Sequence, residues 1–589
     1  MTKLTALQRF FRMLRLDRRD IGYIYLYAIF SGLIVLSLPL GIQAIINLIA
    51  GGAVSAALVV LIGIVTVGSM LTGFLKVMQL TVTENIQRRL FARSSFEFAW
   101  RLPRIKYERL LSEYAPELVN RFFDTLTLQK GLPKLLTDIS TAVLQIIFGL
   151  LLISLYHPSF VAFSIVLMLV LILIFSISGP RGLATSMMES KYKYKVAHWL
   201  EEIARAVTTF KLSGQGRLPL EKTKTLVSGY LKYRHAHFRL LLWQYGAMVL
   251  FKTLVTLSLL ALGSLLVIEN SITIGQFVAA EIVIILVLSS VEKLILSIDT
   301  IYDMLTAVEK IGYFTDLELE QDNKGLGFER IDQGNRGLAM QLRDVSFSFP
   351  DSHRLVLNNI NLEIECGERI CILGPNRSGK TTLIQLAGML YTDYEGSISY
   401  NGLPARNMNY QQLRQHIGDY MRDEDLFSAS LLDNLWLHDE EPNLIQVQWA
   451  MERVGLTEYV ARLPAGYQTE LMPSGRNLPA SVRTKLLIAR TLMGEPRLLA
   501  LGDFGANLNA ADRRRVADLL NDREQPWTVL AVSDDPYFAK SCDRLLYMEE
   551  GRIVLSGPYE ELHQDARVAY VLGLSSDDPT LNLQSAANA

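Results

Sequence analysis

Six long apolar runs constrain the fold of this chain more than any other feature of its sequence. Each is ~20 residues or longer with few charges, which is the length that an α-helix needs to cross the ~30 Å hydrocarbon core of a bilayer. They lie near residues 22–49, 54–80, 136–156, 159–178, 243–268 and 273–297. The composition agrees, because 50% of the 589 residues are hydrophobic and only 20% are charged. We therefore predict a bundle of six transmembrane helices in the first half of the chain.

The charges between the apolar runs predict how the helices are oriented. The connections at 51–52, 157–158 and 269–271 are short and lack Lys and Arg, whereas the segments 88–106 and 181–195 hold many. Because such basic segments remain in the cytoplasm, the long segments and both termini are expected on that side. Their apolar residues recur at spacings of three and four, so spans two to five are predicted to continue as helices beyond the membrane.

Residues 1–20 combine an apolar stripe with five arginines. A helix of this kind is expected to lie at the membrane interface among anionic lipid headgroups, and the alternative is an ordinary surface helix. Of the charged residues within the spans, Lys252 lies near a span end and is expected to be structural. Glu281 lies deeper, where it lines a substrate path, joins two helices or is an interfacial carboxyl.

Residues 374–382 match the phosphate-binding pattern G-x-x-x-x-G-K-[ST]. An apolar run at 370–373 leads into them as a predicted strand, and 383–387 continues as a helix, which is the context that this loop requires. The predicted nucleotide-binding residues are Gly374, Asn376, Ser378, Gly379, Lys380, Thr381 and Thr382. Lys380 is expected to reach the β- and γ-phosphates, and Thr381 to offer its hydroxyl to Mg²⁺. The cytoplasmic ligand is expected to be ATP.

The apolar runs, the phosphate loop and the polar segments between them divide the chain into five parts. We predict an interfacial helix at 1–20, the transmembrane domain at 21–312, a linker at 313–337, an α/β nucleotide-binding domain at 338–575 and a polar tail at 576–589. The net charge of −1 argues against nucleic acid as a partner. The three cysteines have no metal-like spacing and are expected to be reduced thiols.

This arrangement resembles a half-transporter of the ATP-binding cassette (ABC) exporter family. Residues 114–122 look like the first coupling segment of the branch that exports peptides and proteins by type I secretion, and 272–276 look like the start of its sixth span. The resemblance implies a homodimer, or a heterodimer with another half-transporter, in the inner (cytoplasmic) membrane. It further implies a periplasmic adaptor, an outer-membrane channel and membrane lipid as partners.

Several positions depart from the family's pattern. Phe349 keeps the aromatic ring that stacks on adenine, but Arg422 replaces the glutamine that contacts Mg²⁺ and the attacking water. The family signature L-S-G-G-Q reads Leu-Pro-Ala-Ser-Val at 478–482. Gly502 and Asp503 replace the Asp-Glu pair, so Asp503 stands at the general-base position, and Asp534 replaces the histidine that contacts the γ-phosphate. A one-residue slip would make Asp503 the metal carboxylate but would turn the strand's side chains to the wrong face.

These departures leave two functions open. One is an active pump that exports peptides, proteins or lipophilic small molecules with a periplasmic adaptor. The other is a pseudo-ATPase that binds ATP but hydrolyses it very slowly or not at all. For Arg422 there are also two alternatives: it either replaces part of the metal's charge, which would make Mg²⁺ dispensable, or it is an exposed arginine.

Overall fold

The computed structural model describes residues 5–50, 56–111, 113–214, 216–320, 325–328, 334, 337–350, 352, 354–421, 425–438 and 440–575. The chain forms two compact units. The helical unit comprises Met1–Arg104 and Glu113–Leu317, and the α/β unit comprises Ile105–Ser112 and Glu318–Ala589. Arg422 and the predicted tail 576–589 lie outside the described residues.

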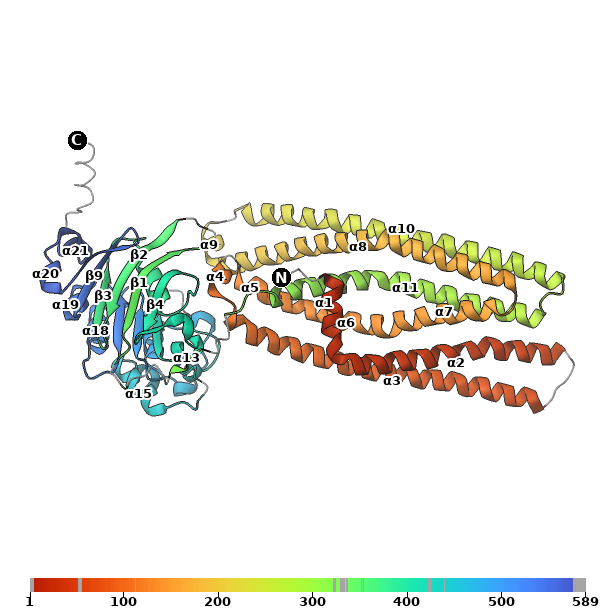
Figure 1. Ribbon diagram of the computed structural model, residues 1–589, viewed down its shortest axis with the longest axis horizontal. Helices are drawn as coiled ribbons and strands as arrows, with labels where there is room; N and C mark the ends of the chain where they lie inside the picture. Colours follow the sequence, from red (N-terminus) through yellow and green to blue (C-terminus); the bar gives the residue numbers. More distant parts are fainter. Residues whose placement is uncertain are drawn as a thin grey trace, which may run out of the picture. The chain divides into compact units, whose positions relative to one another are not determined.

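The helical unit confirms the predicted bundle. Within the described part of the chain, six helices are long and apolar enough to cross a membrane. The main helices are α1 (Ala6–Leu14), α2 (Arg18–Ala50), α3 (Ala56–Arg101), α6 (Asp124–Pro133), α7 (Ser140–Ser154), α8 (Pro158–Arg205), α10 (Leu218–Ile268) and α11 (Ile274–Thr315). Short helical segments are η1 (Arg15–Asp17), η2 (Leu102–Arg104), α5 (Ala115–Asn120), η3 (Arg121–Phe123), the π-helical η4 (Lys134–Ile139) and α9 (Val207–Leu212). Figure 1 shows the long helices side by side, with α1 crossing them.

The longest helices extend beyond the membrane, as predicted. The helix α10 has 51 residues, which at ~1.5 Å per residue makes it far longer than a ~30 Å hydrocarbon core. Apolar side chains of α7 and α11, such as Ile146 and Val287, form the core of the unit. Gly149 allows the close contact, because a Cβ there would lie 2.6 Å from the Val287 side chain.

The α/β unit contains two sheets. The first has the strand order β2-β1-β4-β5, and the second has the order β10-β9-β3-β8-β7-β6. The strands are β1 (Met340–Ser348), β2 (Leu355–Ile364), β3 (Arg369–Leu373), β4 (Glu395–Tyr400), β5 (Leu403–Pro404), β6 (Ile417–Tyr420), β7 (Leu498–Leu501), β8 (Thr528–Val532), β9 (Arg544–Glu549) and β10 (Arg552–Gly557). In the second sheet every neighbouring pair from β9 to β6 is parallel, and β10 pairs with β9 antiparallel.

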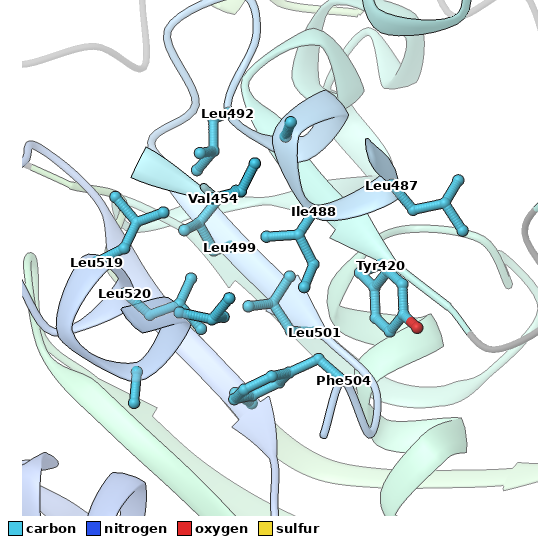
Figure 2. Packing of buried hydrophobic residues seen from close by; sticks show 14 of the residues in the cluster. Tyr420, Val454, Leu487, Ile488, Leu492, Leu499, Leu501, Phe504, Leu519 and Leu520 are labelled. Atoms are coloured by element: carbon cyan, nitrogen blue, oxygen red, sulfur yellow. The ribbon is translucent and has the colours of Figure 1, made fainter. Parts of the chain in front are cut away.

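The central strands of the second sheet are buried on both faces. The helices of the α/β unit are α4 (Tyr107–Leu111), α12 (Lys380–Ala387), α13 (Tyr410–Gln415), α14 (Leu431–Leu435), α15 (Leu444–Arg453), α16 (Thr457–Ala461), α17 (Ala480–Thr491), α18 (Ala510–Leu520), α19 (Pro536–Ser541), α20 (Tyr559–Leu562) and α21 (Ala566–Val571). On one face, Leu499 and Leu501 pack against Ile488 of α17 and Leu520 of α18 (Figure 2). On the other face, Leu498 and Ala500 share a core with α12.

The segment Ile105–Ser112 packs with the α/β unit although spans of the helical unit flank it in the sequence. The carboxylate of Glu108 is buried and accepts hydrogen bonds from the backbone N–H groups of Thr392 (2.6 Å) and Asp393 (3.2 Å). Lys106 forms an ion pair with Glu318 at 2.7 Å. The predicted coupling segment 114–122 belongs instead to the helical unit.

Candidate nucleotide site

The predicted phosphate loop lies between a buried strand and a helix, as the sequence pattern requires. Every residue of β3 is buried, and α12 begins at Lys380 directly after Gly379. Gly374 and Gly379 have φ angles of 141° and 98°, which side chains rarely tolerate. A Cβ on Gly374 would collide with the carbonyl oxygen of Met548, and one on Gly379 would lie 2.8 Å from Leu357. The loop therefore needs glycine at both positions.

Lys380 is folded over this loop. Its ammonium donates to the carbonyl oxygens of Gly374 (2.6 Å) and Pro375 (2.7 Å) and lies 3.4 Å from the hydroxyl of Ser378. Burial lowers the pKa of Lys380, and the negative charges of Asp503 and Asp534 partly offset this effect. Both carboxylates are therefore close enough to act on the ammonium that would meet the phosphates.

The parallel strands bring these groups together. Leu501 pairs with Tyr420 and with Ala531, and Val532 pairs with Ile372. Since the carboxyl ends of neighbouring parallel strands meet at one edge of a sheet, the residues after β3, β7 and β8 gather there. Gly374, Asp503 and Asp534 follow those three strands.

Strand β7 ends at Leu501, directly before Gly502 and Asp503, the two residues that replace the family's Asp-Glu pair. Its side chains alternate between the two cores, with Leu499 and Leu501 on one face and Leu498 and Ala500 on the other. Gly502 follows directly and donates its N–H to the carbonyl oxygen of Tyr420 at 2.7 Å. Asp503 is exposed, and its carboxylate accepts a hydrogen bond from the N–H of Gly505 at 3.2 Å.

The residues near the predicted signature form the start of α17. Pro479 is the N-cap of this helix and supplies no side-chain hydrogen bond to it. The preceding Leu478 is partly buried against the core, and Pro479 and Ala480 are exposed. Lys485 in the second turn forms an ion pair with Asp512 of α18 at 3.2 Å. Sequence reasoning missed this pair, because no local pattern indicates that α17 and α18 meet.

The predicted adenine-stacking residue lies in an aromatic cluster. Phe349 is half-buried and makes edge contacts with Phe347 and Tyr391, at ring-centroid distances of 5.3 and 5.9 Å. Tyr391 was not predicted from the sequence as part of the site, although its aromatic ring shortly after α12 is a signal that could have been used. The cluster holds one side of the Phe349 ring against the first sheet.

The described residues supply donors for a bound triphosphate. Two cradling glycines, the half-buried ammonium of Lys380 and the first turn of α12 supply the donors that phosphate oxygens need. For Mg²⁺ the exposed hydroxyl of Thr381 is available, but the buried Gly502 supplies no carboxylate. Among the described residues, no group of three or more His, Cys, Asp or Glu side chains could hold a metal ion.

Two family models match this chain. One, described as ABC transporter, matches residues 357–503, and the other, described as ABC transporter transmembrane region, matches residues 21–291. Together they span well over half of the sequence. The chain belongs to the ABC transporter family. The first match contains the phosphate loop and strand β7, and the second contains most of the predicted spans.

Known proteins show which ABC transporters this chain is similar to. It is 27% identical over 327 residues to the leukotoxin translocation ATP-binding protein LktB of Mannheimia glucosida. It is 26% identical over 327 residues to the leukotoxin export ATP-binding protein LtxB of Aggregatibacter actinomycetemcomitans. Each match covers 56% of this chain and 45% of the relative, so the chain spans about half the length of the curated relatives it matches.

A solved structure shares the fold of this ABC transporter. It is described as a bacterial Atm1-family ABC exporter with ATP bound, and it matches with a TM-score of 0.85. The match covers 95% of this chain and 99% of that chain at 17% sequence identity. The fold is therefore that of an ABC exporter, with transmembrane and nucleotide-binding regions in one polypeptide.

Proposed function

We propose that this ABC transporter is an exporter-type half-transporter that binds ATP and hydrolyses it very slowly or not at all. The observation that carries the proposal is that one edge of the sheet keeps the residues for nucleotide binding but lacks those for hydrolysis. The phosphate loop after β3 keeps its glycines and Lys380, whereas the ends of β7 and β8 present Gly502, Asp503 and Asp534.

Hydrolysis needs groups that this edge does not supply. A general base must reach the attacking water, and the Asp503 side chain is one methylene shorter than the glutamate of the family pattern. Its carboxylate also accepts the N–H of Gly505. Gly502 has no carboxylate for the metal, and Asp534 brings a negative charge toward a polyanion. Loss of one positioned general base costs ~10²–10⁴ in rate.

The signature carries an independent defect. In the family's dimer each site combines the phosphate loop of one chain with the signature of the other. Pro479 offers neither a hydroxyl nor an N–H, and two flexible glycines are replaced by Ala480 and Ser481. Because both kinds of defect lie in the same chain, an intact partner would still share two incomplete sites with it.

We also propose a membrane location and partner proteins for this transporter. It spans the inner (cytoplasmic) membrane with its nucleotide-binding domain in the cytoplasm, as a homodimer or as a heterodimer with another half-transporter. Its similarity to leukotoxin exporters supports a periplasmic adaptor and an outer-membrane channel as partners.

The proposal is tested by comparing ATP binding with ATP turnover in detergent-purified protein. A labelled ATP analogue should bind the wild type, and Lys380→Ala should reduce its affinity because the half-buried ammonium is lost. Lys540→Ala serves as the control, since this exposed lysine lies in α19 of the same unit. Turnover should stay near background in all three proteins.

Two results would overturn the proposal. Equal binding by the wild type and Lys380→Ala would reject the nucleotide site. Turnover at about 1 s⁻¹ that Lys380→Ala abolishes would identify an active pump, since this rate is ordinary for an enzyme. Restoring Gly502→Asp, Asp503→Glu and Asp534→His together should still give little turnover, because the signature at 478–482 remains defective.

For Arg422 we propose that its guanidinium replaces part of the charge of the metal. The donors of Arg form a planar fork that suits phosphate oxygens, and its charge is permanent. Chelation of Mg²⁺ should then change the ATP affinity little in the wild type and substantially in Arg422→Gln. A strong Mg²⁺ dependence in the wild type that the variant shares would instead indicate an exposed arginine without this role.

A further inference from the structure

An apolar cavity lies beside α1 in the helical unit, away from the nucleotide site. Its volume is about 640 Å³, within the ~300–1,000 Å³ typical of ligand sites. It is lined by residues of α1, η1, the start of α2, η4 and α11. Phe10, Leu136 and Met304 are buried at its base, and they belong to the hydrophobic core of this part of the bundle. We call this cavity the α1 groove.

The charged residues that line the α1 groove are all arginines. They are Arg12, Arg15 and Arg18, and all three are exposed. Nonpolar side chains make up the rest of the lining apart from the ring of Tyr25, which carries a hydroxyl. The groove therefore combines a long apolar floor with a strongly cationic rim.

The acidic residues close in sequence to this rim form ion pairs with arginines of α3 instead of with the rim. Asp17 is 6% exposed and pairs with Arg93 of α3 at 3.2 Å and with Arg89 at 3.6 Å. Asp20 pairs with Arg89 as well. The preceding Arg9 has its own partners, because it pairs with Asp316 at 2.6 Å and with Glu309 at 3.7 Å.

The three rim arginines differ from these neighbours. Within the described part of the chain, no ion pair or hydrogen bond of the Arg12, Arg15 or Arg18 side chain is found. Three exposed positive charges close together repel one another, and an anion placed against them would reduce this repulsion. Their position fits a lipid phosphate, because α1 and η1 directly precede the first membrane span.

We propose that the α1 groove binds an anionic phospholipid, with its phosphate against Arg12, Arg15 and Arg18 and an acyl chain along the apolar floor. A free phosphate would use the rim but would leave the exposed apolar lining residues Leu7 and Phe11 without a partner of matching chemistry. A second copy of the chain would have to bring acidic side chains to the rim. The lipid supplies both features in one molecule, and the site does not depend on ATP hydrolysis.

Photochemical labelling of the full-length protein in phosphatidylcholine vesicles tests this proposal. The probe is a trace of phosphatidylglycerol with a diazirine in its acyl chain, and labelled peptides are located by mass spectrometry. A phosphatidylcholine probe with the same diazirine chain reports non-specific contact. Peptides containing Phe10 or Met304 should take up phosphatidylglycerol about fivefold or more over phosphatidylcholine, since each basic residue near a membrane contributes a comparable factor.

Two triple variants separate this site from general surface charge. Arg12→Gln, Arg15→Gln and Arg18→Gln together should reduce the labelling of the groove to the phosphatidylcholine level. Arg19→Gln, Arg181→Gln and Arg239→Gln together remove the same charge from exposed positions that do not line the groove, and should leave the labelling unchanged. Thermal unfolding midpoints check that both variants are folded.

Four outcomes would overturn the proposal. These are equal labelling by the two probes, equal loss in the two triple variants, competition by inorganic phosphate, and efficient cross-linking of Phe11→Cys to a second copy. Competition would indicate a site for a free anion, and cross-linking would indicate that another chain covers the groove.

Loss of labelling in Leu305→Trp, which fills the apolar lining without changing the charge, would support an acyl chain there.

Discussion

Gly374 illustrates how a single backbone position controls the nucleotide site. Its φ of 141° and the nearby carbonyl oxygen of Met548 leave no space for a side chain. The oxygen of Gly374 in turn accepts a hydrogen bond from Lys380. Replacement of this residue would therefore disturb both the turn of the loop and the position of the ammonium.

We predict that Gly374→Ala destabilises the α/β unit more than Gly402→Ala does. Both glycines have positive φ angles, but a Cβ on Gly402 would meet nothing within 4 Å. The collision should lower the free energy of unfolding by ~1–3 kcal/mol beyond the backbone strain that both variants share. Thermal unfolding followed by tryptophan fluorescence measures this difference, because Trp449 and Trp527 lie in the unit. Equal midpoints for the two variants would contradict the predicted collision.

At the scale of elements, α4 joins the α/β unit through a buried carboxylate. Glu108 is 4% exposed and accepts two backbone N–H groups from the turn after α12. Lys106 stands beside it between Glu318 and Asp393. Although burial is the largest single effect and lowers the pKa of Lys106, these two carboxylates together raise it. The segment is thus held by paired charges and not only by apolar contacts.

We predict that Glu108→Ala accelerates hydrogen exchange at the backbone amides of Thr392 and Asp393. Hydrogen bonds to a charged group contribute ~1.5–3 kcal/mol, so exchange through local opening should rise about tenfold or more. Glu108→Gln keeps one acceptor oxygen and should have a smaller effect. Glu395→Ala, at an exposed position nearby, is the control. Unchanged exchange in Glu108→Ala would show that other contacts hold this segment.

At the scale of the whole molecule, the two units contribute differently to the proposed dimer. In the proposed function, the signature at 478–482 lacks the serine and glycines of the family pattern and offers the γ-phosphate of the opposite chain few donors. ATP should therefore add little to association of the α/β units, and the membrane helices should supply most of the dimer contact.

We predict that ATP changes cross-linking between Asn376→Cys and Ala480→Cys only slightly. Both positions are exposed, whereas Ser378 in the same loop is buried and would react poorly. Cys366 is exposed and is replaced by serine in the background, while Cys371 and Cys542 are buried. A strong ATP-dependent increase in cross-linking would show that the nucleotide closes the dimer and would contradict the prediction.

The sequence alone determined the features that depend on local pattern. Apolar length predicts the six spans, because an isolated helix must match the bilayer. The glycine and lysine spacing at 374–382 predicts the phosphate loop, because that loop is built from consecutive residues. The alternation in β7 similarly placed Gly502 and Asp503 at the end of a buried strand.

Only the tertiary structure decided which distant residues meet. Residues 105–112 pack with a unit whose remaining sequence begins some 200 residues later, and nothing in their own pattern indicates this. The basic stripe at 1–20 was visible in the sequence. Its division into arginines that form ion pairs and arginines that have no partner among the described residues was not. That division arises because Asp17 turns toward α3 and Arg9 reaches α11, and such contacts depend on how helices pack rather than on local periodicity.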